Sequence, residues 1–456
     1  MDITLNKVSD VAYELEIDAR AEELADEIKA ALRRQRGQTQ MKGFRPGKVP
    51  LGLVKKMHGE AIGFGIAEQK VQEAFRSEIL EPDEYDVLGQ PTLTTLDYEL
   101  DGDLHAVVQF GVRPEVDLKD VSGETVSRLK REITDEDVDE QLGNLRRENA
   151  ELVPAEDAEI AEDFHVVVDL QQIDEESGTP IIGEKEEDVE FFVDDERLHD
   201  DLRDGLLGSR IGDSFRVDLP HGEGDHQHTQ TYLVTMKDAK RRELPELDDA
   251  FVGAVTKDEF VSLDELKENI RENLEEAWEQ RSRELLDGRM VEKMLELHTV
   301  PVPESAVELY LDSFVEDVKQ RNDGDLPEGF DEQAFRRANR GEAERQAKWM
   351  LIRDAFIERE EIDISDEELD AYFEEAAGQN EELSPQMIRQ YYQSMNMIER
   401  VKQQLLSRKV FDRLAELFTV EDKDPDAFEE EVEALRKEKE SAEMDRQEPS
   451  SIITPA

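Results

Sequence analysis

Apolar and polar positions alternate at the start of the chain and then change to a helical period. Residues 2–17 (DITLNKVSDVAYELEI) alternate on both sides of Ser9-Asp10, a pattern that predicts a β-hairpin. Residues 20–36 instead carry apolar side chains three and four positions apart, which predicts an amphipathic helix. Gly37 is expected to end this helix, because glycine often follows the last helical turn.

Helices and a second hairpin are predicted in the rest of the first 112 residues. Pro50 is a candidate first residue of a short helix through Met57, and a longer helix is expected over about 60–80. The stretches 91–100 and 103–114 alternate around Asp101-Gly102, a favoured turn dipeptide. Together these elements predict a compact α+β unit.

The middle of the chain changes from a helical bridge to a β-rich region. Thr134 is the expected N-cap of a charged helix within residues 115–150. Four strands are expected after it, at 164–173, 189–193, 213–219 and 230–239.

From residue 244 onward the pattern is helical throughout. Ser262 with Glu265, and Ser365 with Glu368, match capping boxes, and Ser384 precedes a proline suited to the first helical position. Two prolines in VPVPESAVE (300–308) are expected to separate two helices. An all-α region is therefore predicted after the β-rich one.

The chain is strongly acidic, with 116 Asp and Glu against 56 Lys and Arg in 456 residues and a net charge of -60. An acidic function such as cation buffering competes with a solvated surface adapted to concentrated salt. The second is favoured, because the acids are spread along the chain, and at about 1 M salt a Debye length of about 3 Å screens their repulsion. Such a surface repels nucleic acid and anionic membranes, so neither DNA nor a membrane is expected as a partner.

Composition also limits the chemistry. The absence of cysteine excludes disulfides, thiolate catalysis and cysteine-based zinc sites. The sequence has no glycine-rich phosphate loop, and no cofactor is expected. The start MDITLNKVSD does not resemble a signal peptide, and no apolar run approaches about 18 residues, so a soluble cytoplasmic protein is expected.

One stretch reverses the charge of the chain. From Ile28 to Gly59 there is no Asp or Glu, while nine residues are basic. One explanation is a basic helix face that nearby acidic strands neutralise. The favoured explanation is a docking surface for an anionic partner.

The loop MKGFRPGKVP (41–50) lies within this stretch. Its glycines allow a tight exposed turn and its proline stiffens it. Phe44 offers an apolar anchor, and Arg45 and Lys48 can reach phosphates or carboxylates. Because only one loop is involved, sequence-specific nucleic-acid recognition is not indicated.

The loop resembles the ribosome-docking signature of bacterial trigger factor, Gly-Phe-Arg-x-Gly-Lys-x-Pro. Its fixed positions are met by Gly43, Phe44, Arg45, Gly47, Lys48 and Pro50, with Pro46 at a free position. LPELDDAFV (244–252) resembles the family's junction between middle and C-terminal domains, and 300–308 resembles the start of its first helical arm. The resemblance covers about residues 1–430.

This resemblance implies an ATP-independent, ribosome-associated chaperone that shields nascent chains. Residues 43–48 would bind the large ribosomal subunit beside the exit tunnel, reaching a protein at its rim and nearby RNA. Nascent and unfolded polypeptides would be the clients, and a homodimer of the free protein is left open. The competing functions are an enzyme that mainly isomerises prolyl bonds, and an acidic helical scaffold or general chaperone without ribosome docking.

The middle region resembles FKBP-type peptidyl-prolyl isomerases, which implies an isomerase activity without identifying catalytic residues. Such enzymes need an apolar pocket that favours the twisted amide over a barrier of about 18–20 kcal/mol. The framework is retained, but several pocket positions depart from the family's usual aromatics. The candidate pocket residues are Leu170, Phe191, Phe192, Leu202 and Tyr232, for which ordinary core packing is the favoured alternative.

Two further groups of side chains are candidates for binding. His221, His226 and His228 lie close together in the sequence and could hold zinc or nickel, but a solvated polar loop is favoured, so no metal is expected. Met387, Met395 and Met397 lie near Tyr391-Tyr392, where pliable side chains suit contact with varied clients or with the domain's own core.

The predicted fold class is multidomain α+β. The expected divisions are 1–112, an α+β ribosome-binding domain; 113–153, a linker helix region packing with the C-terminal domain; 154–243, an FKBP-like β-rich domain; 244–430, an all-α chaperone domain with two helical arms; and 431–456, a charged disordered tail.

Overall fold

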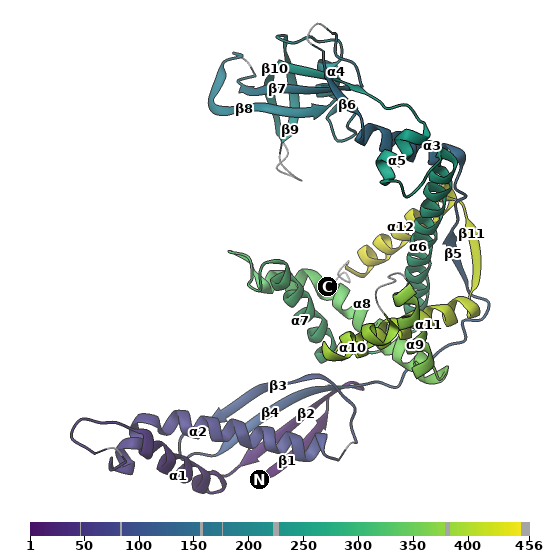
Figure 1. The fold of residues 1–456 in the computed structure, drawn as a ribbon. Coiled ribbons are helices and arrows are strands. Elements are labelled where there is room, and N and C mark those ends of the chain that lie inside the picture. The colour runs from purple at the N-terminus through teal and green to yellow at the C-terminus, as the bar shows by residue number, and fades with distance from the viewer. Residues whose placement is uncertain are drawn as a thin grey trace, which may run out of the picture. The chain divides into compact units, whose positions relative to one another are not determined.

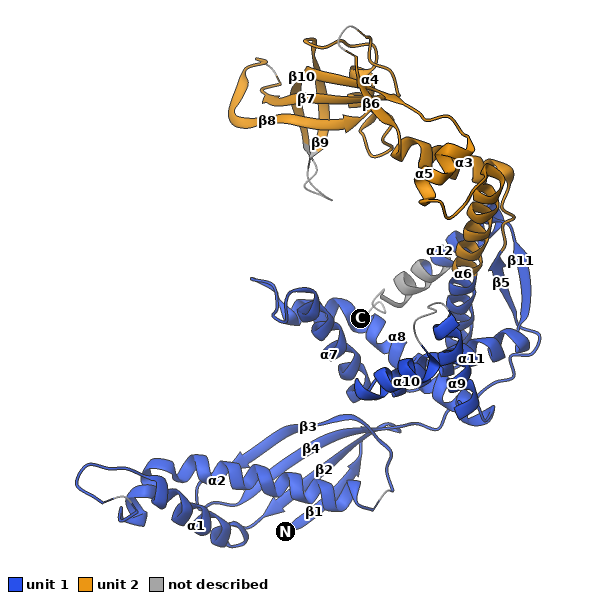
Figure 2. Ribbon diagram, viewed as in Figure 1, with its two compact units in different colours: residues 1–129, 283–456 blue, residues 130–282 orange. Residues whose placement is uncertain are grey.

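The computed structural model describes residues 1–45, 47–82, 84–155, 158–175, 177–221, 228–378 and 384–447. The chain divides into two compact units, unit 1 with residues 1–129 and 283–456, and unit 2 with residues 130–282 (Figure 2). Both helices and sheets are present, as the multidomain α+β prediction requires (Figure 1). In the described parts, no helix is long and apolar enough to cross a membrane.

The N-terminal part of unit 1 is built on a four-stranded antiparallel sheet in the order β1-β2-β4-β3. Its strands are β1 (Asp2–Lys7), β2 (Ala12–Ala19), β3 (Val87–Tyr98) and β4 (Leu104–Val112). Both predicted hairpins are confirmed, because β1 pairs with β2 and β3 with β4. Asp101 takes the positive φ of 68° that the second turn needs.

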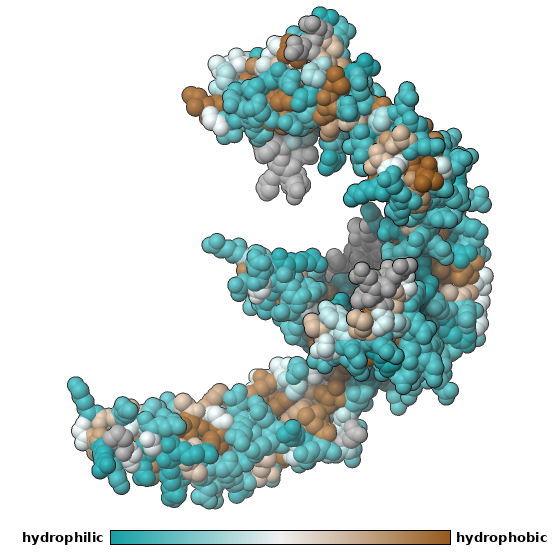
Figure 3. All heavy atoms as spheres, in the orientation of Figure 1, coloured by the Kyte–Doolittle hydropathy of each residue, from teal (hydrophilic) through white to brown (hydrophobic). Residues whose placement is uncertain are grey.

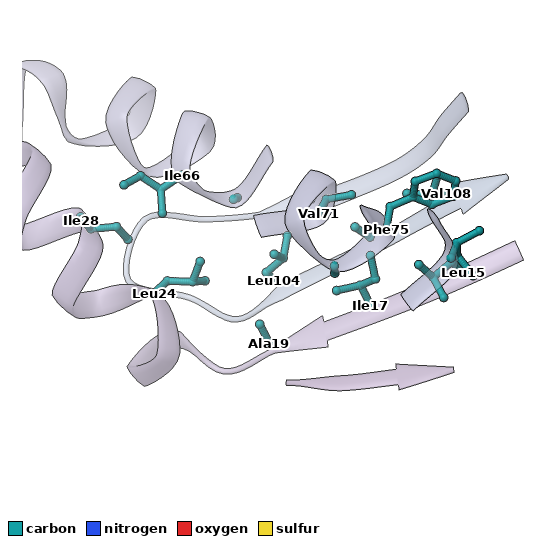
Figure 4. Close-up of a cluster of buried hydrophobic side chains, with 14 of the residues drawn as sticks. Leu15, Ile17, Ala19, Leu24, Ile28, Ile66, Val71, Phe75, Leu104 and Val108 are labelled. Atoms are coloured by element: carbon teal, nitrogen blue, oxygen red, sulfur yellow. The ribbon is translucent and has the colours of Figure 1, made fainter. Parts of the chain in front are cut away.

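Two helices, α1 (Ala21–Gln38) and α2 (Leu51–Phe75), cover one face of this sheet, and a π-helical turn η1 (Arg76–Leu80) follows α2. Their apolar faces, with Phe75 of α2, meet inward side chains of β2 and β4 such as Ile17 and Val108 in one core (Figure 4). Burial of these side chains, rather than helix propensity, supplies most of the stability of such helices.

The predicted helix boundaries here were partly wrong. Gly37 lies inside α1, which continues to Gln38. The two helices predicted from Pro50 are one helix, with Pro50 as its N-cap. Gly59 lies inside this helix. The absence of a side chain there makes room for Leu100, since a Cβ would lie 2.8 Å from Cδ2 of Leu100.

The rest of unit 1 is helical apart from the parallel pair β5 (Thr125–Leu129) and β11 (Thr419–Lys423). Helix α6 (Leu263–Leu297) continues into it from unit 2. The other helices are α7 (Glu304–Arg321), α8 (Glu332–Arg359), α9 (Asp366–Gly378), α10 (Pro385–Ser394), α11 (Ile398–Leu417) and α12 (Pro425–Gln447). The predicted caps form, since Ser365 and Glu368 exchange backbone hydrogen bonds and Ser384 accepts from Met387.

The C-terminal tail differs from the expectation of disorder from residue 431. Helix α12 continues to Gln447, and Phe428 in its first turns is buried. Glu431 accepts from Lys423 at 2.6 Å and from Arg289 at 3.0 Å, which fixes the helix to α6 and β11. Charge alone suggested disorder here, but each of these charges has a partner.

The described residues of unit 2 form a β-sheet, three helices before α6, and the first part of α6. The strands are β6 (Glu151–Pro154), β7 (Phe164–Ile173), β8 (Pro180–Phe192), β9 (Ser214–His221) and β10 (His228–Glu243), and the helices are α3 (Asp135–Glu148), α4 (Asp200–Leu206) and α5 (Asp249–Thr256). The sheet has the order β6-β10-β7-β8, with β9 also paired to β10. All four predicted strands are present, and Thr134 caps α3 as expected.

Candidate functional site

The loop that begins at Lys42 leaves the N-terminal core between two fixed points. Met41 packs against the core and Val49 is 1% exposed. Gly43 and Gly47 have φ values of 94° and 76°, a region that other L-residues rarely adopt. Side chains thus anchor the loop at both ends, and its described residues, 42–45, 47 and 48, project from the core.

The side chains on this projection point into solvent. Phe44 is 40% exposed, and Lys42, Arg45 and Lys48 are exposed. None of the three cations forms an ion pair with another residue that the structure describes. Pro46, the remaining predicted docking residue, lies outside the described residues. The loop therefore offers an aromatic ring between positive charges that no described carboxylate neutralises.

Helices α1 and α2 extend the unneutralised charge. The residues without a described ion partner are Lys29, Arg33, Arg34, Arg36, Lys42, Arg45, Lys48 and Lys56, which we call the basic patch. Lys55 differs, since it binds Asp101 at 2.5 Å. A nearby acidic residue thus neutralises one of the nine basic residues in this stretch. The other eight remain available to a partner.

In unit 2 the structure brings four of the five candidate pocket residues together. Leu170 and Leu202 are buried in its core, and Phe191 and Tyr232 pack against that core while partly exposed. Phe192 points to the opposite face, where its ring lies 4.3 Å from the Arg242 guanidinium. The arrangement is an apolar wall that ends in two partly exposed rings.

The predicted histidine cluster is only partly described. His221 ends β9 and pairs with His228 at the start of β10, and His226 lies outside the described residues. A different group was missed by sequence reasoning. Nδ1 of His105 lies 2.9 Å from Asp18 and 4.0 Å from Glu16, close enough for a shared ion. The Asp18 carboxylate raises the pKa of His105.

The methionine and tyrosine group of α10 divides into two faces. Met387, Tyr391 and Met395 are each more than half exposed and recur every four residues; we call them the α10 stripe. Tyr392 instead packs on Phe373 in a small core, with ring centroids 5.6 Å apart. Core packing thus accounts for Tyr392, whereas the α10 stripe lies exposed and available to a partner.

Comparison with known proteins decides the family. A model described as bacterial trigger factor protein matches residues 1–145, and a model of its C-terminus matches residues 262–416. Trigger factor of Salinibacter ruber is 50% identical over 443 residues, covering 94% of this chain and 96% of the relative. The chain belongs to the trigger factor family.

A second trigger factor, from Chlorobaculum tepidum, is 30% identical over 421 residues, covering 92% of this chain and 97% of its own. A solved structure of the trigger factor chaperone covers 91% of this chain and 99% of its own at 21% identity, with a TM-score of 0.44. Trigger factors are ribosome-associated chaperones, so the expected function class is confirmed, with the ribosome and unfolded polypeptides as partners.

Proposed function

We propose that this trigger factor docks on the large ribosomal subunit at the exit tunnel through the loop of residues 42–48, and shields nascent chains without using ATP. The observation that supports this is the basic patch, eight unneutralised cations in a chain of net charge -60. Ribosomal RNA is a polyanion, so an acidic protein needs a local surface of opposite sign to approach it. Phe44 would add an apolar anchor to a protein at the tunnel rim.

We also propose that the α10 stripe contributes to client binding. Methionine and tyrosine side chains adapt to varied apolar partners. Because the stripe has only three exposed side chains, its contact area is small and its binding is expected to be weak. Weak contact suits a chaperone that must release each client without a nucleotide cycle. In this proposal residues 1–112 dock, 154–243 supply the family-implied isomerase, and 244–430 hold the client.

Co-sedimentation with purified ribosomes tests the docking surface. We expect the triple variant Phe44→Ala, Arg45→Ala, Lys48→Ala to lose at least tenfold in ribosome affinity, measured as the fraction pelleted at rising ribosome concentration. A matched control removes one exposed apolar and two exposed basic residues elsewhere, Leu309→Ala, Arg321→Ala and Arg337→Ala.

The control should pellet like the original chain, because its residues lie on α7 and α8, outside the basic patch. If the loop variant pellets as well as the original chain, the docking assignment is wrong. If both triple variants lose affinity equally, general charge rather than the loop governs the association.

We propose, as a separate matter, that the acidic surface is adapted to concentrated salt. A second proposal is that the free chain forms a homodimer. Hydrophilic residues cover most of the face shown in Figure 3, and salt would screen their repulsion. The unfolding temperature should then rise between 0.1 and about 2 M KCl; a fall would contradict the adaptation. A mass in sedimentation that stays at 52.4 kDa, the mass of one chain, as protein concentration rises would contradict the dimer.

A further inference from the structure

Strand β3 leaves one edge of the N-terminal sheet open. It lies at the end of the order β1-β2-β4-β3, and no other described strand pairs with its outer edge. Helix α7 touches its beginning, where Ser305 donates a hydrogen bond to the Leu88 carbonyl. From Gln90 to Thr94 the strand is exposed. A row of free backbone N–H and C=O groups at such an edge can pair with another chain.

The sequence of this edge lacks protective charges, and Pro91 with two shifts in the strand register is the protection that it keeps. Residues 87–96 (VLGQPTLTTL) contain no charged side chain, in a chain of which 38% is charged. Proteins commonly place lysines and other charges on exposed edges to prevent pairing. Strand β1, at the opposite edge, carries Asp2 and Lys7 in only six residues. The β3 edge therefore lacks the charges that block pairing, while Pro91 removes one backbone N–H donor from the strand.

A groove lies beside this edge, between β3 and the C-terminal half of α2. Its volume is about 920 Å³, and Val71, Phe75 and Val108 of the core form part of its wall. Two shifts in the β3–β4 register, between Leu88 and Thr92 and between Leu93 and Thr95, disturb the pairing there.

Leu93 shows that the groove is an uncovered part of the core face. It pairs with Val108, which is 5% exposed, so both side chains lie on the same face of the sheet. Leu93 itself is 37% exposed, and Leu80 across the groove is 50% exposed. Helix α2 thus leaves the middle of β3 around Leu93 uncovered, although Tyr98 near the end of the strand packs against the core.

We propose that this groove binds an extended apolar segment of an unfolded polypeptide, which adds to β3 as a further strand. The free backbone groups would pair with the segment, and alternate side chains would fill the groove. The rim carries Glu68, Glu73 and Arg76, and Lys70 already pairs with Glu73 at 2.9 Å, so the groove has little net charge and suits an apolar segment. This inference rests on the proposed chaperone function and locates a client site in the N-terminal domain, separate from the α10 stripe.

The test uses the full chain and a labelled peptide of alternating leucine and serine with a lysine at each end. Leu93→Asp should weaken peptide binding at least tenfold, measured by fluorescence anisotropy. Leu5→Asp is the matched control, because Leu5 is also 37% exposed, lies on the opposite edge strand and pairs with core residue Leu15. It should change the affinity less than twofold.

A second peptide separates strand pairing from apolar contact. Methylation of alternate backbone nitrogens keeps the side chains but removes N–H donors along one edge, and should also cost at least tenfold. Equal binding of both peptides would contradict strand addition. Equal losses in Leu93→Asp and Leu5→Asp would show damage to the sheet and overturn the site.

The remaining outcomes distinguish this site from the proposed function. If the original chain binds the peptide and Leu93→Asp binds it equally, the groove is wrong while client binding stands. If the original chain binds no peptide, client binding itself fails. If Leu93→Asp converts a dimer to monomers without changing peptide affinity, the groove joins two copies of this chain and the proposal is wrong.

Discussion

His298 should make the helical part of unit 1 sensitive to mild acid. Its side chain is 2% exposed, its Nδ1 lies 2.7 Å from the Met294 carbonyl, and its Nε2 accepts the Lys119 backbone N–H at 2.9 Å. This pattern requires the neutral ring with its proton on Nδ1. A proton on Nε2 would face the N–H of Lys119 and break the link between α6 and the segment before β5.

The direction of the effect follows from the pKa. Burial, with nearby cations including Lys119 and Lys348, lowers the pKa of His298 below its usual 6.5, although the bond to Met294 opposes the shift. The unfolded chain therefore binds more protons than the folded one as pH falls below about 6.5. Stability present at neutral pH is lost at up to about 1.4 kcal/mol per pH unit for this one group.

The chain offers a local reporter for this effect, since it has two tryptophans. Trp349 packs against the core that contains Met294 and stacks on Phe411 at 6.0 Å, whereas Trp278 lies in unit 2. In a Trp278→Phe background, urea unfolding followed by Trp349 fluorescence reports on this core alone.

We expect His298→Gln to cost about 1 kcal/mol at pH 7.5, because glutamine can still accept from Lys119 but loses the bond to Met294. Between pH 6.5 and 5.5 the original chain should lose about 1 kcal/mol more than the variant. His105→Gln is the control, because His105 lies on β4 of the N-terminal sheet, away from the core that Trp349 reports, and should leave the pH dependence unchanged. Identical pH dependence in the original chain and in His298→Gln would refute the reasoning.

Three further predictions concern charge and the middle region. Burial raises the pKa of Asp287 from 3.8 to about 6, so stability is lost as pH rises from about 3.8 through 6. Asp287→Asn should therefore add roughly 1 kcal/mol at pH 7.5, after allowance for partial exposure, and clearly less at pH 4.5 in urea titrations. Lys48→Ala should reduce the slope of log K against log salt for ribosome binding by about 0.7–0.9, and an unchanged slope would mean no phosphate contact at Lys48. In a peptide assay of X-Pro isomerisation, Phe191→Leu should slow turnover severalfold and Phe192→Leu should not. The reason is that only Phe191 packs against the other candidate pocket residues. Equal effects of the two variants would argue against this pocket.

Regular alternation made several strands predictable from the sequence. Strand β7 begins at Phe164 and ends at Ile173, as expected, because its apolar positions pack into one core. The first half of β8 was missed. Residues 180–188 are exposed and mostly charged, so no apolar alternation marks them, and their pairing with β7 comes from the hairpin itself.

Candidate sites were predictable where one short segment supplies them. The docking loop could be found because its glycines, aromatic ring and cations are contiguous, and because the acid-free stretch is visible in the sequence. The group of Glu16, Asp18 and His105 could not be found, since it depends on strands 87 residues apart meeting in register at Asp18 and His105. The β3 groove likewise depends on how far α2 covers the sheet, although the charge-free run 87–96 was a visible signal.

Two segments depart from the acidic surface of this chain, the basic patch and the charge-free part of β3, and one physical reason accounts for both. A surface with so many carboxylates excludes most partners by repulsion, and each carboxylate also keeps neighbouring strands and chains apart. The basic patch lacks acids where a polyanion must approach, and residues 87–96 of strand β3 lack all charge where a backbone could pair. If both segments serve binding, adding one acid to either should weaken its own partner without affecting the other. Arg45→Glu should reduce ribosome binding and leave peptide binding unchanged, and Leu93→Asp should do the reverse.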